Sequence, residues 1–513
     1  MKTKALLTIL CTILCNITGY GQEFKDIPRK EMPQDELTQI GTRATGEYVM
    51  NEFPTIGEDV KAIVILAEFD DVRFSIPHDS LRTLLSKRYN ADNYTEEVSF
   101  DEFSDAFQQS LKREFCIPGS ARDYFRSQSF GKFVPSFDVV GPVTLEKPRA
   151  EYGANKSNGK DKNTLSMIKD ACKKASEKGT DFTNYDNDGD GKVDIVYVVY
   201  AGCDEAQTAN APNKVPDAIW AKASSSPFKV DGIDITVARY ACSGELVMDL
   251  PEVAGIGTFV HEFSHVLGLP DFYNTQADDF TMDVWSVMDY GMYNMEGFVP
   301  CAYTAFERYS LGWIPMHTLD APATLSIGIT DEEERGYRIY TSDKDTTSFY
   351  MLETIRQEGW NRYAANYYGD DAPLIHGLLI SEVTYDASAW ENNTVNAGSQ
   401  HRHCIVPANN VYYYKNAHLH LFGNSNHEFT LSSTPASITQ FGTKMNKPIT
   451  DITYDKETGT TSFNFCGGNI TDGVGGLKNQ ESDTQILYDL QGRIVEHPSK
   501  GIYLRDGKKI VIK

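Results

Sequence analysis

The sequence is poor in three features that would assign it to a specialised class of protein. After residue 21 no stretch is apolar enough to span a bilayer, so we expect no transmembrane segment in the mature chain. Basic residues are scarce: 48 Lys and Arg against 72 Asp and Glu give a net charge of -24, spread along the chain. This argues against nucleic acid as a partner. The sequence has nine cysteines, and the seven that follow residue 21 show no paired short spacing, which argues against a disulfide scaffold or a metal-thiolate site.

A short apolar run does occur at the start of the chain. Lys2 and Lys4 precede apolar residues over 5–17, and small residues follow up to Gly21. This order of charge, apolar core and small residues predicts a signal peptide over residues 1–21. A membrane anchor is the alternative, but a spanning helix needs about 20 apolar residues.

The whole chain, at 513 residues, is long enough for two or three domains. Residues 22–58 are polar and broken by prolines, and we interpret them as a propeptide or a flexible leader. A mixed α/β region is expected over 59–320 and a β-rich accessory domain over 321–467. Residues 468–513 begin with a Gly- and Asn-rich linker and end in short alternating strands.

The pattern of apolar residues indicates the main elements of the α/β region. Nearly continuous apolar runs predict buried strands, strict alternation predicts an edge strand, and helical spacing closed by caps predicts helices. The predicted elements are buried strands over 60–69 and 193–202, helices over 101–115, 120–129 and 163–178, and an alternating strand over 232–240. The last strand is a candidate to pair with an extended substrate at the edge of a cleft.

One helix carries the strongest chemical signal, in the stretch "IGTFVHEFSHVLGLPD". His261 and His265 are four residues apart and therefore project from one face of a helix, as two ligands of one zinc ion must. Glu262 lies beside the first ligand, where it can take a proton from a zinc-bound water as general base. Gly268 permits a sharp turn that brings Asp271 to the same ion. The pattern HExxHxxGxxD thus predicts a catalytic zinc with an open fourth position.

A second segment, "WSVMDYG", fits the same chemistry. In metzincins a tight turn carrying methionine passes beneath the zinc ligands, and Met288 is a candidate for that turn. Tyr290 could direct its hydroxyl at the oxyanion that forms when water attacks a peptide carbonyl. The alternative is that both are ordinary core residues.

The chain resembles the secreted metallopeptidases typified by immune inhibitor A. The likeness lies in "HEFSHVLGLPDFYN", in "ARDYFRSQSFGKF" before it, and in "PCAYTAFERYSLGWI", "SFYMLETIRQEGWNRY" and "GLLISEVTYDASAWENNTVN" after it. It covers roughly residues 60–410. The resemblance implies that His261, His265 and Asp271 bind zinc and that Glu262 is the general base. Ser264 is a departure from the family, which usually has glycine or another small residue there, but serine is also small.

The resemblance also implies a structural calcium ion, for which "DNDGDGKVD" is the candidate. Asp186, Asp188, Asp190 and Asp194 follow the spacing of an oxygen-rich loop, with Gly191 at its sharp turn. The loop lacks an acidic residue at the twelfth position and is therefore not a complete EF-hand. The alternative is a solvated acidic turn.

The end of the chain, "ILYDLQGRIVEHPSKGIYLRDGKKIVIK", resembles the C-terminal sorting domains that the bacterial type IX secretion machinery recognises. The resemblance implies export across both membranes of a diderm bacterium, to the medium or the cell surface. The alternative is one more small β module of the mature protein.

These observations predict an α+β catalytic domain of the zincin or metzincin type, followed by a β-rich, sandwich-like domain and a small β sorting domain. The predicted function is that of a secreted zinc-dependent endopeptidase acting on extracellular proteins or peptides. The alternative is an inactive adhesion or glycan-binding protein that uses the β-rich domain. An intact set of ligands and an intact general base count against that alternative.

Overall fold

A computed structural model describes most of the chain between residues 57 and 512. The described residues are 57, 60–104, 109–156, 160–208, 215, 217–247, 252–277, 279–364, 375–412, 414–468, 501–505 and 508–512. The predicted signal peptide, nearly all of the predicted leader and most of the predicted linker lie outside them. The chain divides into two compact units, residues 1–470 and 471–513. The boundaries of the individual domains remain predictions.

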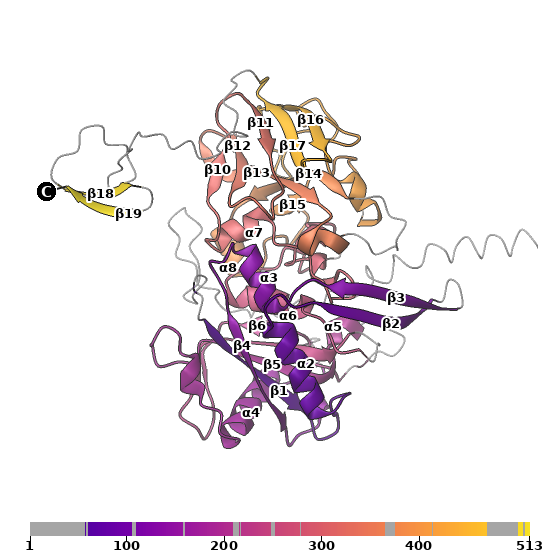
Figure 1. The fold of residues 1–513 in the computed structure, drawn as a ribbon, viewed down its shortest axis with the longest axis vertical. Coiled ribbons are helices and arrows are strands. Elements are labelled where there is room, and N and C mark those ends of the chain that lie inside the picture. Colours follow the sequence, from indigo (N-terminus) through magenta and orange to yellow (C-terminus); the bar gives the residue numbers. More distant parts are fainter. Residues whose placement is uncertain are drawn as a thin grey trace, which may run out of the picture. The chain divides into compact units, whose positions relative to one another are not determined.

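A five-stranded sheet forms the core of the first part of the chain (Figure 1). Its order is β4-β1-β5-β9-β6; the first four strands are parallel and β6 is antiparallel to β9. The strands are β1 Lys61–Glu68, β4 Ser136–Thr144, β5 Val196–Cys203, β6 Lys222–Ser224 and β9 Tyr240–Leu246. β1 and β5 are buried over nearly their whole length, as their continuous apolar runs predict.

Helices α2 His78–Asn90, α3 Ala121–Gln128, α4 Thr164–Glu177, α5 Glu205–Thr208 and α6 Gly257–Val266 accompany this sheet. Two of the predicted helices are confirmed. α3 begins after Ser120, whose side chain accepts from the amide of Asp123 in a capping box. α4 ends just before Gly179, which has a φ of +92°. α6 packs against β9 and β6, so the edge of the sheet supports the helix that carries the histidines.

The predicted helix over residues 101–115 is wrong. β2 Glu96–Ser104 and β3 Gln109–Ile117 form an antiparallel ribbon there, which projects from the body in Figure 1. The reason lies in contacts distant along the chain. The ring of Phe115 packs 5.4 Å from that of Phe298 and 6.1 Å from that of Tyr363, and this packing overrides the local helical spacing.

The prediction that residues 232–240 form an edge strand is also wrong. Thr236–Val237 (β8) pairs with Phe228–Lys229 (β7), Val237 also bridges to Val193 just before β5, and β9 begins at Tyr240 inside the sheet, between β5 and β6. The alternating segment therefore pairs with two other segments and is not a sheet edge. The edge strand beside β9 is β6, which is too short to show alternation in the sequence.

The part of the first unit that follows is rich in β structure, as predicted. One sheet has the order β10-β12-β13-β14-β15 and a second has the order β11-β17-β16. Their strands are β10 Met316–Thr318, β11 Ala323–Ile327, β12 Gly336–Ser342, β13 Asp345–Arg356, β14 His376–Thr384, β15 His403–Ile405, β16 Ile449–Asp455 and β17 Thr460–Phe465. The short helices α7 Ala305–Ser310 and α8 Ala387–Glu391 flank them.

Short 3-10 helices connect several of these elements. They are η1 Arg149–Glu151, η2 Phe182–Tyr185, η3 Asp283–Trp285, η4 Tyr290–Tyr293, η5 Gly359–Tyr363 and η6 Tyr414–Leu419. In the second unit, β18 Gly501–Arg505 pairs with β19 Lys508–Ile512 as an antiparallel hairpin. Among the described residues no helix combines the length and the apolar character that a membrane span requires.

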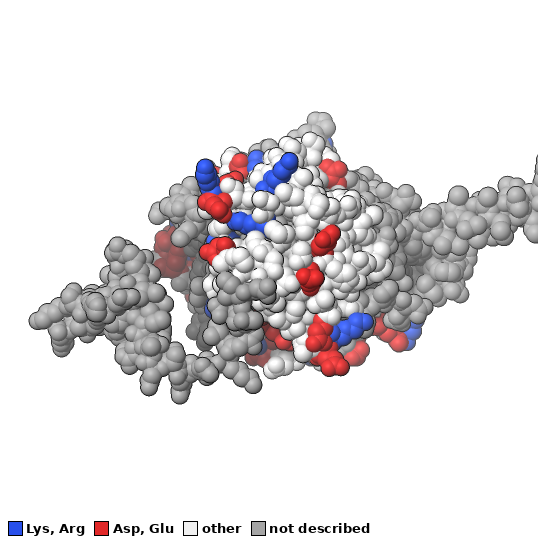
Figure 2. Space-filling view, turned by 90° about the horizontal axis from the view of Figure 1, so that it is seen from above, with Lys and Arg blue, Asp and Glu red and all other residues white. Residues whose placement is uncertain are grey.

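Charged side chains of both signs are scattered over the face shown in Figure 2, and neither sign forms a continuous patch there. Cys172, Cys242, Cys301 and Cys404 are buried as free thiols. The core of the first unit therefore does not depend on cross-links between them.

Candidate metal centre

The two histidines of α6 are fixed by hydrogen bonds to main-chain carbonyls. His261 Nδ1 donates to Val287 O over 2.8 Å, and His265 Nδ1 donates to Leu269 O over 2.7 Å. A carbonyl oxygen can only accept, so each Nδ1 carries a proton, and in the neutral form of each ring Nε2 has the lone pair that can bind a metal ion. The two ring centroids are 4.8 Å apart. The imidazoles are thus oriented as ligands of a single ion.

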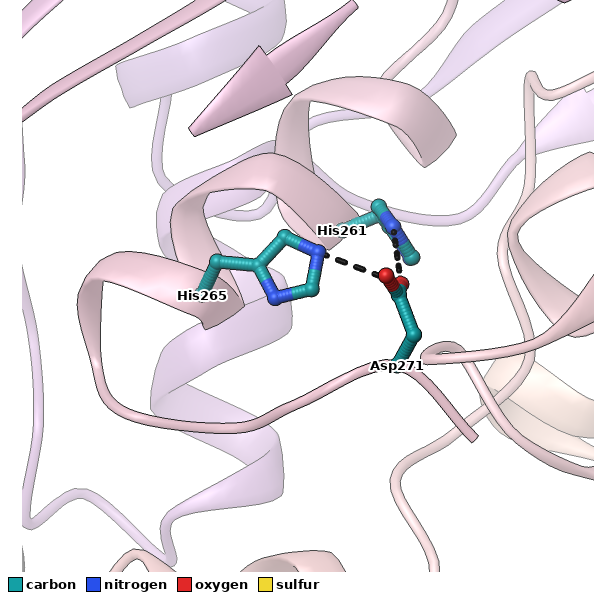
Figure 3. Close-up of side chains that lie close together, drawn as sticks. All are labelled: His261, His265 and Asp271. Carbon is teal, nitrogen blue, oxygen red and sulfur yellow. Dashed lines mark ion pairs between the residues drawn. The ribbon is translucent and has the colours of Figure 1, made fainter. Parts of the chain in front are cut away.

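The chain then turns back and brings a carboxylate to the same place. Gly268 has a φ of +108°, a conformation that side chains disfavour, and the turn carries Asp271 towards the histidines. Asp271 Oδ1 lies 3.3 Å from His261 Nε2 and 3.2 Å from His265 Nε2. Figure 3 shows both rings directed at this carboxylate.

These three side chains fit a metal ion. Their ligand atoms all lie within 4.8 Å of one another, and all three residues are buried. Within the described part of the chain, His265 Nε2 and Asp271 Oδ1 have no partner with hydrogen-bond geometry. Two neutral imidazoles and one carboxylate are a typical donor set for catalytic zinc, which keeps a fourth position open.

The electrostatics of the metal-free cluster already favour a positive charge there. Burial alone would lower the pKa of His265, but the adjacent Asp271 carboxylate raises it to about 9. Burial would raise the pKa of Asp271, but the two histidines hold it well below its usual range. A proton therefore occupies the site that a cation would otherwise fill, because a buried carboxylate requires a positive partner.

Glu262 lies on the same helix and faces a pocket. The pocket is lined by Ala206, Trp220, Ala221, Thr258, His261, Glu262, Tyr273, Asp289, Tyr290, Met292 and Tyr293. Burial raises the pKa of Glu262 to about 7. A carboxyl group with a pKa near neutrality can both accept and donate a proton, as a general acid-base residue must.

Met288 and Tyr290 are brought to the same centre. Met288 is fully buried, its carbonyl accepts from the amide of Phe272, and the preceding carbonyl, Val287 O, holds His261. The turn around Met288 thus supports the segments that carry two of the proposed ligands. Tyr290 lines the pocket beside His261 and Glu262.

The acidic loop is organised differently. Asp186, Asp188 and Asp190 bring carboxylate oxygens within 4.8 Å of one another and are partly or fully exposed. Asp194 is buried and is not part of this cluster; its carboxylate accepts from the main-chain and side-chain nitrogens of Asn187. Of the four predicted calcium ligands, the structure brings together three.

Sequence reasoning missed Asn393, which contacts the centre. Its amide Nδ2 donates to Asp271 Oδ2 and its Oδ1 accepts from the amide nitrogen of Asp271, both over 2.6 Å. The only signal in the sequence is the pair of asparagines in "WENNTVN", 122 residues beyond the aspartate. No periodicity connects two segments so far apart.

The fold and the site together define a class of protein. A mixed α/β domain carries a helix with two histidines, and an aspartate carboxylate faces both rings. A glutamate of the same helix lines the adjoining pocket. This is the arrangement of a metallopeptidase. Comparison with known families identifies the particular family of metallopeptidases. Residues 55–314 match the family described as immune inhibitor A peptidase M6, catalytic domain, and the chain belongs to this family.

Two curated relatives are similar to this chain over about half of its length or more. Immune inhibitor A of Bacillus thuringiensis subsp. alesti is 26% identical over 365 residues, covering 62% of this chain and 50% of the relative. Pre-pro-metalloprotease PrtV of Vibrio cholerae serotype O1 (strain M66-2) is 24% identical over 288 residues, covering 49% of this chain and 29% of the relative. The chain thus spans half or less of the length of these relatives.

Proposed function

We propose that the protein is a zinc-dependent endopeptidase that hydrolyses peptide bonds of extracellular proteins. The observation that carries this proposal is the buried cluster of His261, His265 and Asp271 beside Glu262. When bound, zinc would supply a Lewis acid that polarises the scissile carbonyl and makes water more acidic. Glu262 accepts a proton from the attacking water and then delivers it to the leaving amine. Its pKa near neutrality suits both steps.

Two further side chains have proposed roles in this reaction. The Tyr290 hydroxyl donates a hydrogen bond to the oxyanion as the carbonyl carbon becomes tetrahedral. Met288 forms the apolar floor of the site. Because β6 is one of the two outermost strands of the sheet, and Trp220 and Ala221 before it line the pocket, an extended substrate would pair alongside β6.

A structural calcium ion is proposed for the acidic loop. The clustering of Asp186, Asp188 and Asp190 supports it, because three carboxylates this close repel one another without a cation. Asp194 contributes indirectly, because its carboxylate accepts a hydrogen bond from the side-chain nitrogen of Asn187. The side-chain oxygen of Asn187 accepts from the main-chain amide of Lys61 at the start of β1. Calcium would therefore tie the loop to the start of β1 in the central sheet.

The route out of the cell is also a proposal. Residues 1–21 act as a signal peptide and residues 22–58 as a propeptide or leader; the name of the Vibrio relative, a pre-pro-metalloprotease, is consistent with both. Residues 468–513 are recognised by the type IX secretion machinery of a diderm bacterium and deliver the protein to the medium or cell surface. The β-rich part, over residues 321–467, is arranged as a sandwich-like accessory domain following a catalytic domain of the zincin type.

Peptide cleavage by purified protein beginning at Gln22 tests the proposed activity. Zinc is counted per chain, and Glu262→Ala is prepared identically as the control. We expect wild type to hold one zinc ion and cleave, and the variant to hold zinc without cleaving. If the wild type holds no zinc and stays inactive after residues 22–58 are trimmed, the zinc assignment fails. Adhesion or glycan binding by the β-rich part then becomes the better explanation of its function.

A further inference from the structure

The third proposed ligand is held by a part of the chain that lies outside the matched catalytic domain. The segment from α8 to β15 packs against the loop that follows α6. Trp390 Nε1 donates to Gly268 O over 3.1 Å, and Asn396 Nδ2 donates to Phe272 O over 2.6 Å. Between these two contacts, Asn393 bonds both the main chain and the side chain of Asp271. The family match ends at residue 314, well before this segment.

The orientation of the Asn393 amide is determined by its partners. The main-chain nitrogen of Asp271 can only donate, so the atom that accepts from it must be Oδ1. The NH2 group then necessarily faces Asp271 Oδ2. Both residues are buried, which makes this hydrogen bond to a carboxylate stronger and more directional than one in water.

The consequence concerns the other carboxylate oxygen. With Oδ2 bound to the amide, Oδ1 is left facing the Nε2 atoms of His261 and His265, at 3.3 and 3.2 Å. Rotation of the carboxylate away from the histidines would break a buried charge-assisted bond. The amide therefore fixes which oxygen is presented to an ion.

The backbone of Asn393 is adapted to this contact. Its φ is +53°, in the left-handed region where asparagine is better tolerated than most residues. The residue follows α8, which is capped at its start by Asp386 and closes at Asn392. The main-chain N–H of Asn393 donates to Trp390 O, so the turn that directs the Asn393 side chain inward is itself held by α8.

We infer that Asn393 is a positioning residue for Asp271, and that the β-rich part of the chain thereby completes the metal centre of the catalytic domain. This inference rests on the proposed zinc function. It predicts that metal affinity depends on a residue that contacts neither zinc nor substrate. Asn396 offers a matched comparison, because it is an equally buried asparagine of the same segment that bonds the same loop without touching the Asp271 carboxylate.

The test uses the full chain with two isosteric variants, Asn393→Asp and Asn396→Asp. Zinc affinity is measured by competition with a chromophoric chelator, and the visible absorption of the Co²⁺ form reports the geometry of the ligands. We expect Asn393→Asp to weaken zinc binding by about 10- to 100-fold and to change the Co²⁺ spectrum, because a carboxylate cannot donate to Asp271. We expect Asn396→Asp to lower thermal stability but to leave zinc affinity within about threefold of wild type.

Two results would overturn the inference: wild-type zinc affinity and spectrum in Asn393→Asp, or an equal loss in Asn396→Asp. If Asn393→Asp does not fold, Asn393→Gly replaces it, since glycine accepts the positive φ and removes the amide without adding charge. Asp271→Ala separates this inference from the proposed function. If wild type binds no zinc, or binds it independently of Asp271, both fail; if binding depends on Asp271 but not on Asn393, only the inference fails.

Discussion

The buried cluster of His261, His265 and Asp271 and the exposed acidic loop are built in opposite ways. Asp271 is buried, and its partners lie on α6 and on a segment 122 residues further along the chain. Asp186 is partly exposed, and its carboxylate accepts from the main-chain amides of Gly189, Asp190 and Gly191 within its own loop. Tertiary packing therefore preforms the first cluster, whereas local main-chain bonds form the second.

This difference predicts different consequences of losing a ligand. In the buried cluster a missing side chain leaves an unpaired charge, which costs more than the bond itself. In the exposed loop, water replaces what is lost.

Removal of one ligand from each cluster gives the sharpest contrast. Mutation of a residue that only hydrogen-bonds to a metal ligand lowers metal affinity by up to roughly 100-fold. His265→Ala removes a ligand itself, so it should reduce zinc affinity by more than this and should abolish peptide cleavage. Asp188→Asn should leave both unchanged, because its loop contacts none of the proposed zinc ligands. Zinc content and cleavage rate measured on both variants check this. Equal losses in the two variants would show that the clusters are not independent.

Tyr290→Phe tests the chemistry of the buried site without disturbing its ligands. The cleavage rate should fall by about 10²- to 10³-fold, because one donor to the oxyanion is lost, while zinc content stays at one per chain. The kcat and KM of a fluorogenic peptide provide the measurement. An unchanged kcat would show that Tyr290 only lines the pocket and does not stabilise the oxyanion.

Calcium should act on stability and not on chemistry. At a calcium concentration 100 times its Kd, binding to the folded state adds about 2.7 kcal/mol to the free energy of unfolding. Thermal unfolding of the wild type with and without calcium, and of Asp186→Asn, checks this expectation. If calcium raises the Tm of Asp186→Asn as much as that of the wild type, the loop is a solvated acidic turn.

The metal-free protein should lose stability as the pH rises. The pKa of His265 is raised to about 9 in the folded state, so its stabilising proton is fully present below the ordinary value near 6.5 and is lost as the pH rises through about 9. Between pH 6.5 and 8 this amounts to roughly 2 kcal/mol. Urea unfolding of chelator-treated wild type and His265→Gln checks it. Parallel pH dependences in the two proteins would contradict the assignment.

The sequence predicts the parts of the centre that depend on local spacing. Two histidines at i and i+4 and a glycine before the aspartate determine where those side chains project, and the structure brings them together. The ribbon over β2 and β3 could not be predicted, because the packing of Phe115 on Phe298 decides its conformation. Asn393 was missed for the same reason, since its role exists only through a contact with Asp271.

The most direct test of the proposed zinc centre is to locate zinc in crystals of the full chain by anomalous scattering at the zinc edge. We expect one ion about 2.0–2.2 Å from His261 Nε2, His265 Nε2 and Asp271 Oδ1, with Asn393 on the other carboxylate oxygen. No zinc at these atoms, or zinc bound elsewhere in the molecule, would contradict it.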